Sequence, residues 1–331
     1  MQTPRLFTLL PEYINTPDGM EIDRHGNLIL SCPNYAEPEI TSGLVVKISP
    51  DKKITKWFDV PVEPTTGVAR NMGICFDDDW NLYLCDNQGW SGEERLQFKG
   101  RLLKVKADDD GHIGQCTVVA RGMEHPNGVK WRGGYVYVTQ SLLSKVKLPG
   151  GEMVSCVYRF RADDEDIEVT NTLADKNIIA TFITHNLGCP YGADGLDFGP
   201  DGALYVGNFG DGSVNRILFD GDGNVLENHV VAQNPAQLTS TDGFCFDEKG
   251  NLYIADFSAN AICVMRPDFS LERIAQSPDC DGLDGSLDQP GEPRVYRGKI
   301  VASCFDLVTD PGKVNTAHEM PATMSELDLV P

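Results

Sequence analysis

The chain lacks long apolar runs and paired cysteine motifs. None of its apolar stretches approaches the roughly 20 residues that a membrane-spanning helix needs. The apolar run near the N-terminus, in residues 1–11, is too short for a secretion signal. Ten cysteines are present, but none form Cys-x-x-Cys, and several stand inside strand patterns, where free cysteine behaves as a small hydrophobe. These features predict a protein of the reducing cytoplasm.

Positive charge and histidine are also scarce. The 28 Lys and Arg residues face 49 Asp and Glu residues, which gives a formal net charge of −21. This balance disfavours nucleic acid and anionic membranes as partners, because nothing in it would replace phosphate counterions. No Gly-x-Ser-x-Gly, phosphate-binding loop or dinucleotide motif occurs, so serine-hydrolase and nucleotide chemistry have no support. A small molecule is the expected partner; the composition says nothing of the oligomeric state.

What the chain does contain is one motif repeated several times. Each copy is a short strand, a turn and a second strand of alternating apolar residues, as in Asp242-Gly-Phe-Cys-Phe-Asp followed by Asn251-Leu-Tyr-Ile. The copies begin at Asp18, Met72, Asn127, Asp194 and Asp242. A degenerate last copy, Lys299–Ser303, closes the series.

Repeats of roughly 40–50 residues with four strands each are typical of β-propellers. Six units fit the 331 residues, so the sequence predicts an all-β fold, a six-bladed propeller forming a single domain over residues 1–331. Strand patterns near both ends, at Arg5 and at Met324, predict one blade completed by the two termini, which closes the ring. Longer stretches at 87–100, 140–154 and 162–190 interrupt the repeat, and their Trp90, Phe98 and Leu142 suggest a lid with an apolar wall over one face.

The residues that open the inner strands form the main candidate site. Equivalent positions in successive blades make a ring around the propeller axis, and four of the five repeats place a hard oxygen donor there: Asp18, Asn127, Asp194 and Asp242. Three carboxylates brought together without compensation would be costly, because buried like charges cannot all ionise. A divalent cation is the natural compensation. Oxygen-only ligands favour Ca²⁺, with Mg²⁺ or Mn²⁺ next and Zn²⁺ after them.

Two alternatives stay open at this point. Asp-Gly and Asn-Gly are common turn dipeptides, so a repeat protein could simply repeat its turn. Glu21 is the rival ligand to Asp18; its odd spacing predicts that it faces the other side of the strand. Asn71, one residue before the ring position of the second repeat, is a candidate for supporting a ligand.

The most specific motifs resemble a known family. They are His125-Pro-Asn-Gly-Val, Gly192-Ala-Asp-Gly-Leu-Asp-Phe and Ser240-Thr-Asp-Gly-Phe-Cys-Phe-Asp. Over residues 15–320 the chain resembles the senescence marker protein/gluconolactonase family of calcium-dependent propeller hydrolases, with diisopropylfluorophosphatase and paraoxonase as more distant relatives. The resemblance implies that metal ligands come from the first, third, fourth and fifth blades. Asp18 departs from the glutamate usual in the first blade, and Asp194 from the asparagine more common in the fourth.

These observations lead to a functional hypothesis and its rivals. The hypothesis is a metal-dependent hydrolase of a small cyclic ester, in which the cation polarises the carbonyl and Asp194 or Asp242 orients or deprotonates the attacking water. His125 and His185 are candidates to border the mouth of the site as acid or base. The rival enzymatic reactions are cleavage of a carbon–carbon bond in a cyclic diketone and hydrolysis of a phosphoester. The non-enzymatic rival is a protein-binding propeller that holds a structural ion.

Overall fold

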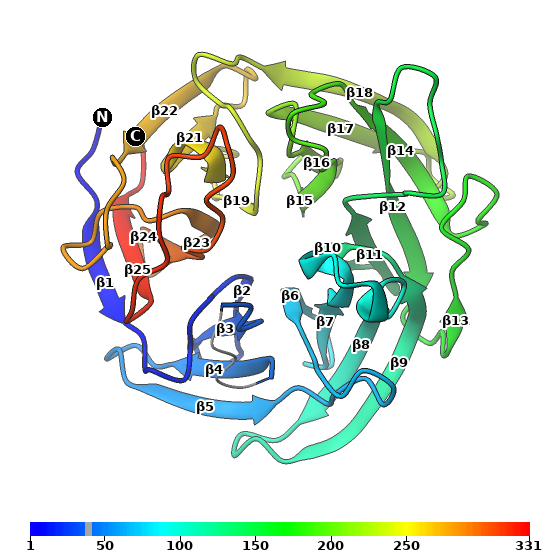
Figure 1. Cartoon of the computed structure of the whole chain (residues 1–331), viewed down its shortest axis with the longest axis horizontal. Helices are drawn as coiled ribbons and strands as arrows, with labels where there is room; N and C mark the ends of the chain where they lie inside the picture. The colour runs from blue at the N-terminus through cyan, green and yellow to red at the C-terminus, as the bar shows by residue number, and fades with distance from the viewer. Residues whose placement is uncertain (37–41) are drawn as a thin grey trace.

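The computed structural model describes residues 1–36 and 42–331, and these form a ring of six sheets, each built on four antiparallel strands. Figure 1 shows the sheets arranged as blades around a central axis. No α-helix occurs within the described residues, which include three short 3-10 helices: η1 (Gln88–Ser91), η2 (Glu94–Leu96) and η3 (Phe257–Ala259). The predicted six-bladed β-propeller is confirmed.

Each blade runs from an inner strand at the axis to an outer strand at the rim. Blade one is β2 (Met20–Ile22), β3 (Leu28–Cys32), β4 (Leu44–Ile48) and β5 (Ile54–Asp59). Blade two is β6 (Asn71–Phe76), β7 (Leu82–Asp86), β8 (Gly100–Ala107) and β9 (Ile113–Met123), and the short β13 (Ile167–Glu168) pairs with β9 in parallel. Blade three is β10 (Pro126–Arg132), β11 (Tyr135–Gln140), β12 (Met153–Arg161) and β14 (Ile178–Thr184).

The remaining blades follow the same plan. Blade four is β15 (Ala193–Phe198), β16 (Leu204–Asn208), β17 (Ser213–Phe219) and β18 (Val225–Gln233). Blade five is β19 (Phe244–Phe246), β20 (Leu252–Asp256), β21 (Ala261–Met265) and β22 (Leu271–Gln276). Blade six is β23 (Pro290–Tyr296), β24 (Lys299–Cys304), β25 (Thr323–Asp328) and β1 (Arg5–Leu9).

The two ends of the chain complete blade six together, as the sequence predicted. Strand β1 pairs antiparallel with β25, with Arg5 opposite Glu326 and Leu9 opposite Thr323. In Figure 1 the N- and C-terminal labels lie beside each other at this blade. The pairing closes the ring and leaves β25 with a partner on both sides.

Several hairpin turns share one side-chain arrangement. In blade one, Asp23 Oδ1 accepts hydrogen bonds from the backbone N–H groups of His25 and Asn27, both at 2.9 Å, and Asn27 Nδ2 donates to Asp23 Oδ2 at 2.8 Å. Aspartate and asparagine favour such turns because their short side chains bond the neighbouring backbone. The same Asp-to-Asn arrangement recurs four residues apart at Asp77–Asn81, Asp220–Asn224 and Asp247–Asn251.

The inner strands approach one another at a ring of glycines, one from each blade: Gly19, Gly73, Gly128, Gly195, Gly243 and Gly291. A Cβ atom at Gly195 would stand 2.4 Å from the carbonyl oxygen of Asp242 in the next blade. A Cβ atom at Gly73 would stand 2.5 Å from the carbonyl oxygen of Asn127. Glycine is therefore required here for close approach between backbones. The Asp-Gly and Asn-Gly pairs belong to this ring, and the turn interpretation of them is excluded.

Two details of the predicted organisation were wrong. Lys299–Cys304 is β24, the second strand of blade six, and the inner strand of that blade is β23, which opens with Pro290-Gly291-Glu292. The stretch 162–190 is not only a connection between blades, since it contains β14, the outer strand of blade three, and β13, which extends blade two. Both segments deviate from the sequence repeat, so their assignment to a blade became clear only from the strand pairing.

None of the helices in the described ranges has both the length and the apolar character needed to cross a bilayer.

Candidate active site

The ring residues are aimed at the axis by a bulge at the start of each inner strand. In blade one, Asp18 N donates to Ser31 O at 2.9 Å and Ser31 N donates to Gly19 O at 2.8 Å, so two residues of the inner strand face one residue of its neighbour. Asp242 and Gly243 face Ala255 in the same way in blade five. Pairing shifts at the same place in blades two, three, four and six. Such bulges re-aim side chains and are common beside functional sites.

The four predicted oxygen donors converge at the floor of one cavity. Asp18, Asn127, Asp194 and Asp242 all line it, from blades one, three, four and five, whereas the blade-two position is the apolar Met72. Asp194 shares side-chain hydrogen bonds with Asp242 and with Asn127. Hydroxyl groups of neighbouring blades hold the backbone here, because Ser303 Oγ donates to Asp18 O at 2.8 Å and Thr139 Oγ1 donates to Asp194 O.

Burial and mutual repulsion act on the three carboxyls. Asp18 and Asp194 are 5% and 6% exposed. Burial, followed by the charges of Asp242 and Glu292, raises the pKa of Asp18 well above its usual range. Burial and the charge of Asp18 raise the pKa of Asp194, and burial and Asp194 raise that of Asp242. Among the described residues, no Lys or Arg forms an ion pair with these three. The ring therefore holds three carboxyls without a basic partner, and a divalent cation would stabilise their ionised form.

The ring supplies only oxygen donors, which are the ligands that Ca²⁺ prefers. Asp18, Asp194 and Asp242 do not bring three carboxylate oxygens within 4.8 Å of one another; among the described residues, the group that does so is Asp288, Asp306 and Glu319, treated below. The donor set of the ring therefore fits Ca²⁺ in its chemistry.

Glu21 is not at the cavity floor. It forms ion pairs with Arg294 of blade six and with Lys130 of blade three, the latter at 3.7 Å. Since Lys130 lies two blades away, the pair spans the central channel below the ring. The expectation that Glu21 faces away from the channel is wrong, because the bulge at Asp18 and Gly19 breaks the simple alternation of the strand. Those cations lower its pKa against the effect of burial, so Glu21 is a partner of buried cations.

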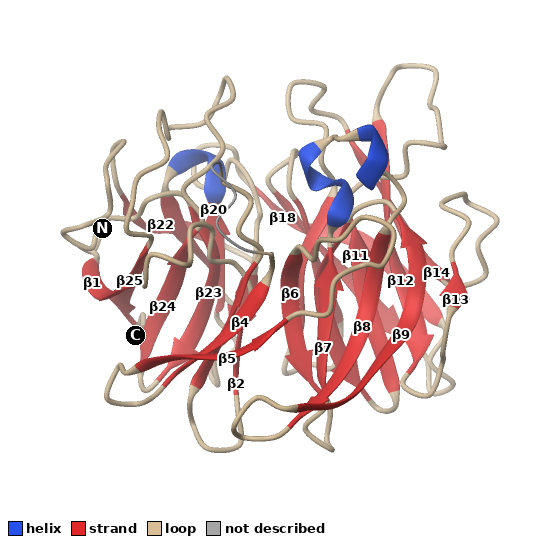
Figure 2. Cartoon of the chain, turned by 60° about the horizontal axis from the view of Figure 1, so that its bottom comes forward, coloured by secondary structure: helices blue, strands red, loops and turns tan. Residues whose placement is uncertain are grey.

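The walls of the cavity contain several aromatic side chains. The cavity has a volume of about 600 Å³. Its aromatic lining consists of Tyr35, Trp90, Tyr191, Phe209, Phe257 and Phe305. Of the predicted wall residues Trp90 lines the cavity, with its ring centroid 4.4 Å from that of Tyr35. Phe98 and Leu142 are not among the described lining residues, and Phe98 packs against Lys145 instead. Figure 2 shows the long connections and the short helices gathered at one end of the blades.

The two predicted histidines have different positions. His125 lines the cavity and is 4% exposed, and burial lowers its pKa to about 4. The amide Nδ2 of Asn87 lies 3.3 Å from His125 Nδ1. These two nitrogen atoms are within hydrogen-bond distance, and the tautomer of the His125 ring decides which group donates. His185 is exposed and outside the described lining, and its backbone N–H donates to Asp211 Oδ1 at 2.9 Å. The prediction that His185 borders the site was therefore wrong.

Three polar residues near the ring were not predicted. Ser141 lines the cavity with a buried Oγ that has no hydrogen-bond partner. Lys313, from the connection between β24 and β25, reaches the cavity wall, and its Nζ donates to Ser258 Oγ at 2.9 Å. Glu292 is the acidic residue of the misplaced sixth inner strand; its Oε1 accepts from Met20 N at 3.3 Å, and burial raises its pKa to about 7. Identifying β23 from its Pro290-Gly291 pair would have located Glu292.

Asn71 is buried but does not reach the ring. Its Nδ2 donates to Ser31 Oγ at 2.6 Å and to Leu44 O at 3.0 Å, so it connects blade two to blade one.

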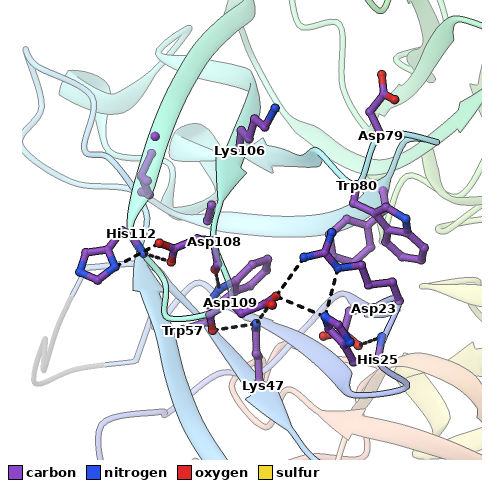
Figure 3. A pocket seen from close by; sticks show the side chains of 15 residues that line it. Asp23, His25, Lys47, Trp57, Asp79, Trp80, Lys106, Asp108, Asp109 and His112 are labelled. Atoms are coloured by element: carbon purple, nitrogen blue, oxygen red, sulfur yellow. Dashed lines mark hydrogen bonds and ion pairs between the residues drawn. The ribbon is translucent and has the colours of Figure 1, made fainter.

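A second cavity, of about 420 Å³, lies at the other end of the blades, where inner strands turn into second strands (Figure 3). Several of its charged groups are paired with one another: Asp109 Oδ1 lies 3.3 Å from Arg24 Nη2 and 3.4 Å from His25 Nε2. Trp57 Nε1 donates to Asp108 O at 2.8 Å. These groups already have partners, and they do not converge on one point as the oxygen ring does.

Several solved structures share this fold. A gluconolactonase from Xanthomonas campestris matches with a TM-score of 0.61 and 16% identity, over 99% of this chain and 96% of its own. A luciferin-regenerating enzyme matches with a TM-score of 0.66 and 13% identity, over 98% and 96%. Regucalcin from Agrobacterium tumefaciens, described as a calcium-binding protein, matches with a TM-score of 0.59 and 12% identity, over 98% and 92%.

At these identities the likeness shows the fold. The neighbours include gluconolactonases, the kind of propeller that the sequence motifs resemble. No family model and no curated protein matches the chain. Because one fold can host many chemistries, function has to be argued from the site itself.

Proposed function

We propose that the protein is a metal-dependent hydrolase of a small cyclic ester, a lactone. The observation that carries this proposal is the convergence of three carboxyls and one amide, from four different blades, at the floor of a concave aromatic cavity. Such a donor set suits Ca²⁺, with other divalent cations as alternatives. A bound cation would supply a Lewis acid for a carbonyl oxygen. The gluconolactonase and regucalcin neighbours are consistent with this chemistry.

The chain's own side chains have separate roles in this proposal. Asp18, Asn127, Asp194 and Asp242 would hold the ion. Asp194 and Asp242 share a hydrogen bond, and a carboxylate oxygen of this pair that is left free of the ion would accept the proton of the attacking water.

The walls position and shield the substrate. His125, whose pKa is lowered to about 4 by burial, places a neutral imidazole at the wall. The aromatic side chains exclude bulk water and favour a substrate less polar than an open sugar acid.

The alternatives use the same site. A cyclic diketone or a phosphoester could meet the same metal and water, and the choice rests with the cavity walls. The protein-binding propeller has less support, because the aromatics around the ring line a cavity of small-molecule size instead of an open face.

The test is a hydrolysis screen of lactones, cyclic diketones and phosphoesters with and without a chelator. Lactone turnover should require a divalent cation, and Asp242→Asn should reduce kcat/KM by more than about 100-fold by weakening the metal site. Asp222→Asn is the matched control, since Asp222 lies in an exposed hairpin turn of blade four. Lactone hydrolysis unaffected by chelation or by Asp242→Asn would refute the proposal, and turnover confined to another substrate class would correct it.

A further inference from the structure

A second group of carboxylates lies at the same end of the ring, in blade six. Asp288 precedes β23, Asp306 follows β24 and Glu319 precedes β25. One carboxylate oxygen from each lies within 4.8 Å of those of the other two. Three segments of chain therefore meet at this point.

These carboxyls are buried without adequate partners. Asp288 and Asp306 are each 2% exposed. The Oδ1 atoms of both residues, and Oε2 of Glu319, have no hydrogen-bond partner. A buried carboxylate oxygen without a partner costs several kcal/mol unless a proton or a cation compensates it.

The protein side chains supply little of that compensation. Within residues 1–36 and 42–331, no Lys or Arg forms an ion pair with any of the three. His318 Nδ1 lies 3.3 Å from Asp306 Oδ2, but the same nitrogen hydrogen-bonds the backbone carbonyl oxygen of Asp306. The unpartnered oxygen atoms of Asp288, Asp306 and Glu319 are thus left without a Lys or Arg counter-charge among the described residues.

The position of the cluster links it to the wall of the active-site cavity. Asp306 and Glu319 stand at the two ends of residues 307–318, and Glu319 N donates to Asp306 Oδ2 at 2.7 Å, which draws the ends together. Leu307, Val308 and Lys313 of this segment line the cavity. Gln289, next to Asp288, fixes the start of the segment through its Oε1, which accepts from Leu307 N and Val308 N at 2.8 Å each.

We propose that Asp288, Asp306 and Glu319 bind a second divalent cation, which fastens the segment 307–318 to the body of blade six. Three carboxylates and no nitrogen or sulfur ligand favour Ca²⁺, with backbone oxygens and water completing its coordination. An ion here would close the neck of the segment and hold one wall of the cavity in place. The site shares no residue with the central ring, so it stands independently of the proposed function.

The first experiment counts bound ions. After dialysis against Ca²⁺, the Asp288→Asn variant should hold one equivalent of ion fewer than the wild-type protein. The Glu319→Gln variant, which changes the less buried partner, should show the same loss. Asp284→Asn is the matched control, because Asp284 is an exposed carboxylate of the same connection. Asp242→Asn should remove only the ion of the central ring. If Asp288→Asn and Glu319→Gln both bind as many ions as the Asp284 control, the proposal is wrong.

The second experiment follows the segment itself. Trypsin cleavage after Lys313, detected by mass spectrometry, should accelerate when wild-type protein is chelated and when Glu319 is replaced by Gln. Asp242→Asn should leave cleavage slow while Ca²⁺ is present. Equal cleavage of Glu319→Gln and Asp284→Asn in Ca²⁺ would overturn the fastening role. If the ion count shows that wild-type protein binds an ion at the blade-six cluster and none at the central ring, the hydrolase proposal fails and the blade-six proposal stands.

Discussion

At the scale of single residues, two acidic side chains three positions apart have opposite tasks. Asp18 stands in the oxygen ring without a cationic partner, whereas Glu21 neutralises Arg294 and Lys130 in the channel below. The bulge at the start of β2 separates the two levels while leaving both side chains near the axis. The position relative to the bulge thus separates an unpaired ring carboxyl from a carboxylate in internal ion pairs.

This division predicts different results for two isosteric substitutions. Asp18→Asn should weaken Ca²⁺ binding about 10-fold or more, because it removes one of the charges that offset the cation. Glu21→Gln should leave the Ca²⁺ dissociation constant nearly unchanged. It should lower the free energy of unfolding by roughly 3 kcal/mol, since Arg294 and Lys130 lose their counter-charge. Calorimetric titration and urea unfolding of both variants give the answer. A loss of affinity confined to Glu21→Gln would show that the ring assignment in blade one is mistaken.

At the scale of elements, strand β1 is the piece that completes blade six. Its inward residue Phe7 is 6% exposed and meets Tyr296 edge to face at 6.2 Å, with Lys52 Nζ 4.4 Å from its ring centroid. The strand therefore joins blade six to blade one by side-chain packing as well as by backbone pairing.

The packing of β1 makes a second prediction. Phe7→Ala should lower the free energy of unfolding by about 3 kcal/mol, the usual cost of truncating a buried aromatic. Leu9→Ala in the same strand should cost about 0.5 kcal/mol or less, because Leu9 is 43% exposed. Denaturant unfolding measures both. Similar losses for the two variants would mean that β1 is held by its hydrogen bonds and not by Phe7.

Much of the arrangement of strands and of the ring residues could be predicted from the sequence, and the predictions that failed did so for physical reasons. The regular repeats predicted the number of blades and the ring of Asp18, Asn127, Asp194 and Asp242. The strand patterns near the two ends predicted how the ring closes. The inner strand of blade six was missed because Pro290 and Glu292 replace the usual residues of the repeat. His185 was misplaced because loop conformation depends on contacts such as that with Asp211, which are remote in sequence.

At the scale of the whole molecule, the glycine ring sets how closely the six blades approach the axis. The glycines of blades one to five lie against the backbone of the next blade, whereas Gly291 of blade six lies against the Asp18 side chain, so the spacing of the blades around the oxygen ring depends on these glycines. A change at one of them would be felt by ligands on other blades.

The third prediction tests this dependence. Gly195→Ala should lower the free energy of unfolding by about 1–3 kcal/mol, because its Cβ would overlap Asp242 O at 2.4 Å and force neighbouring blades apart. It should weaken Ca²⁺ binding at the same time. Gly114→Ala in the outer strand β9 should do neither, since its Cβ would find only an ordinary contact of 3.7 Å. Thermal unfolding and calcium titration test both. Unchanged affinity in a folded Gly195→Ala protein would contradict the link between blade spacing and the site.

The shared construction of blade six also means that the ring has no intrinsic first blade. The chain ends lie side by side, and Gln2 Nε2 donates to Asp328 O at 3.0 Å while Asp328 N donates to Gln2 Oε1 at 2.9 Å. A short peptide could join residues 1 and 331, and the chain could be reopened at the exposed turn around Asp222. Such a circular permutant would keep every strand pair and every ring residue. Its synthesis would begin in blade four, about half-way around the propeller from the natural start.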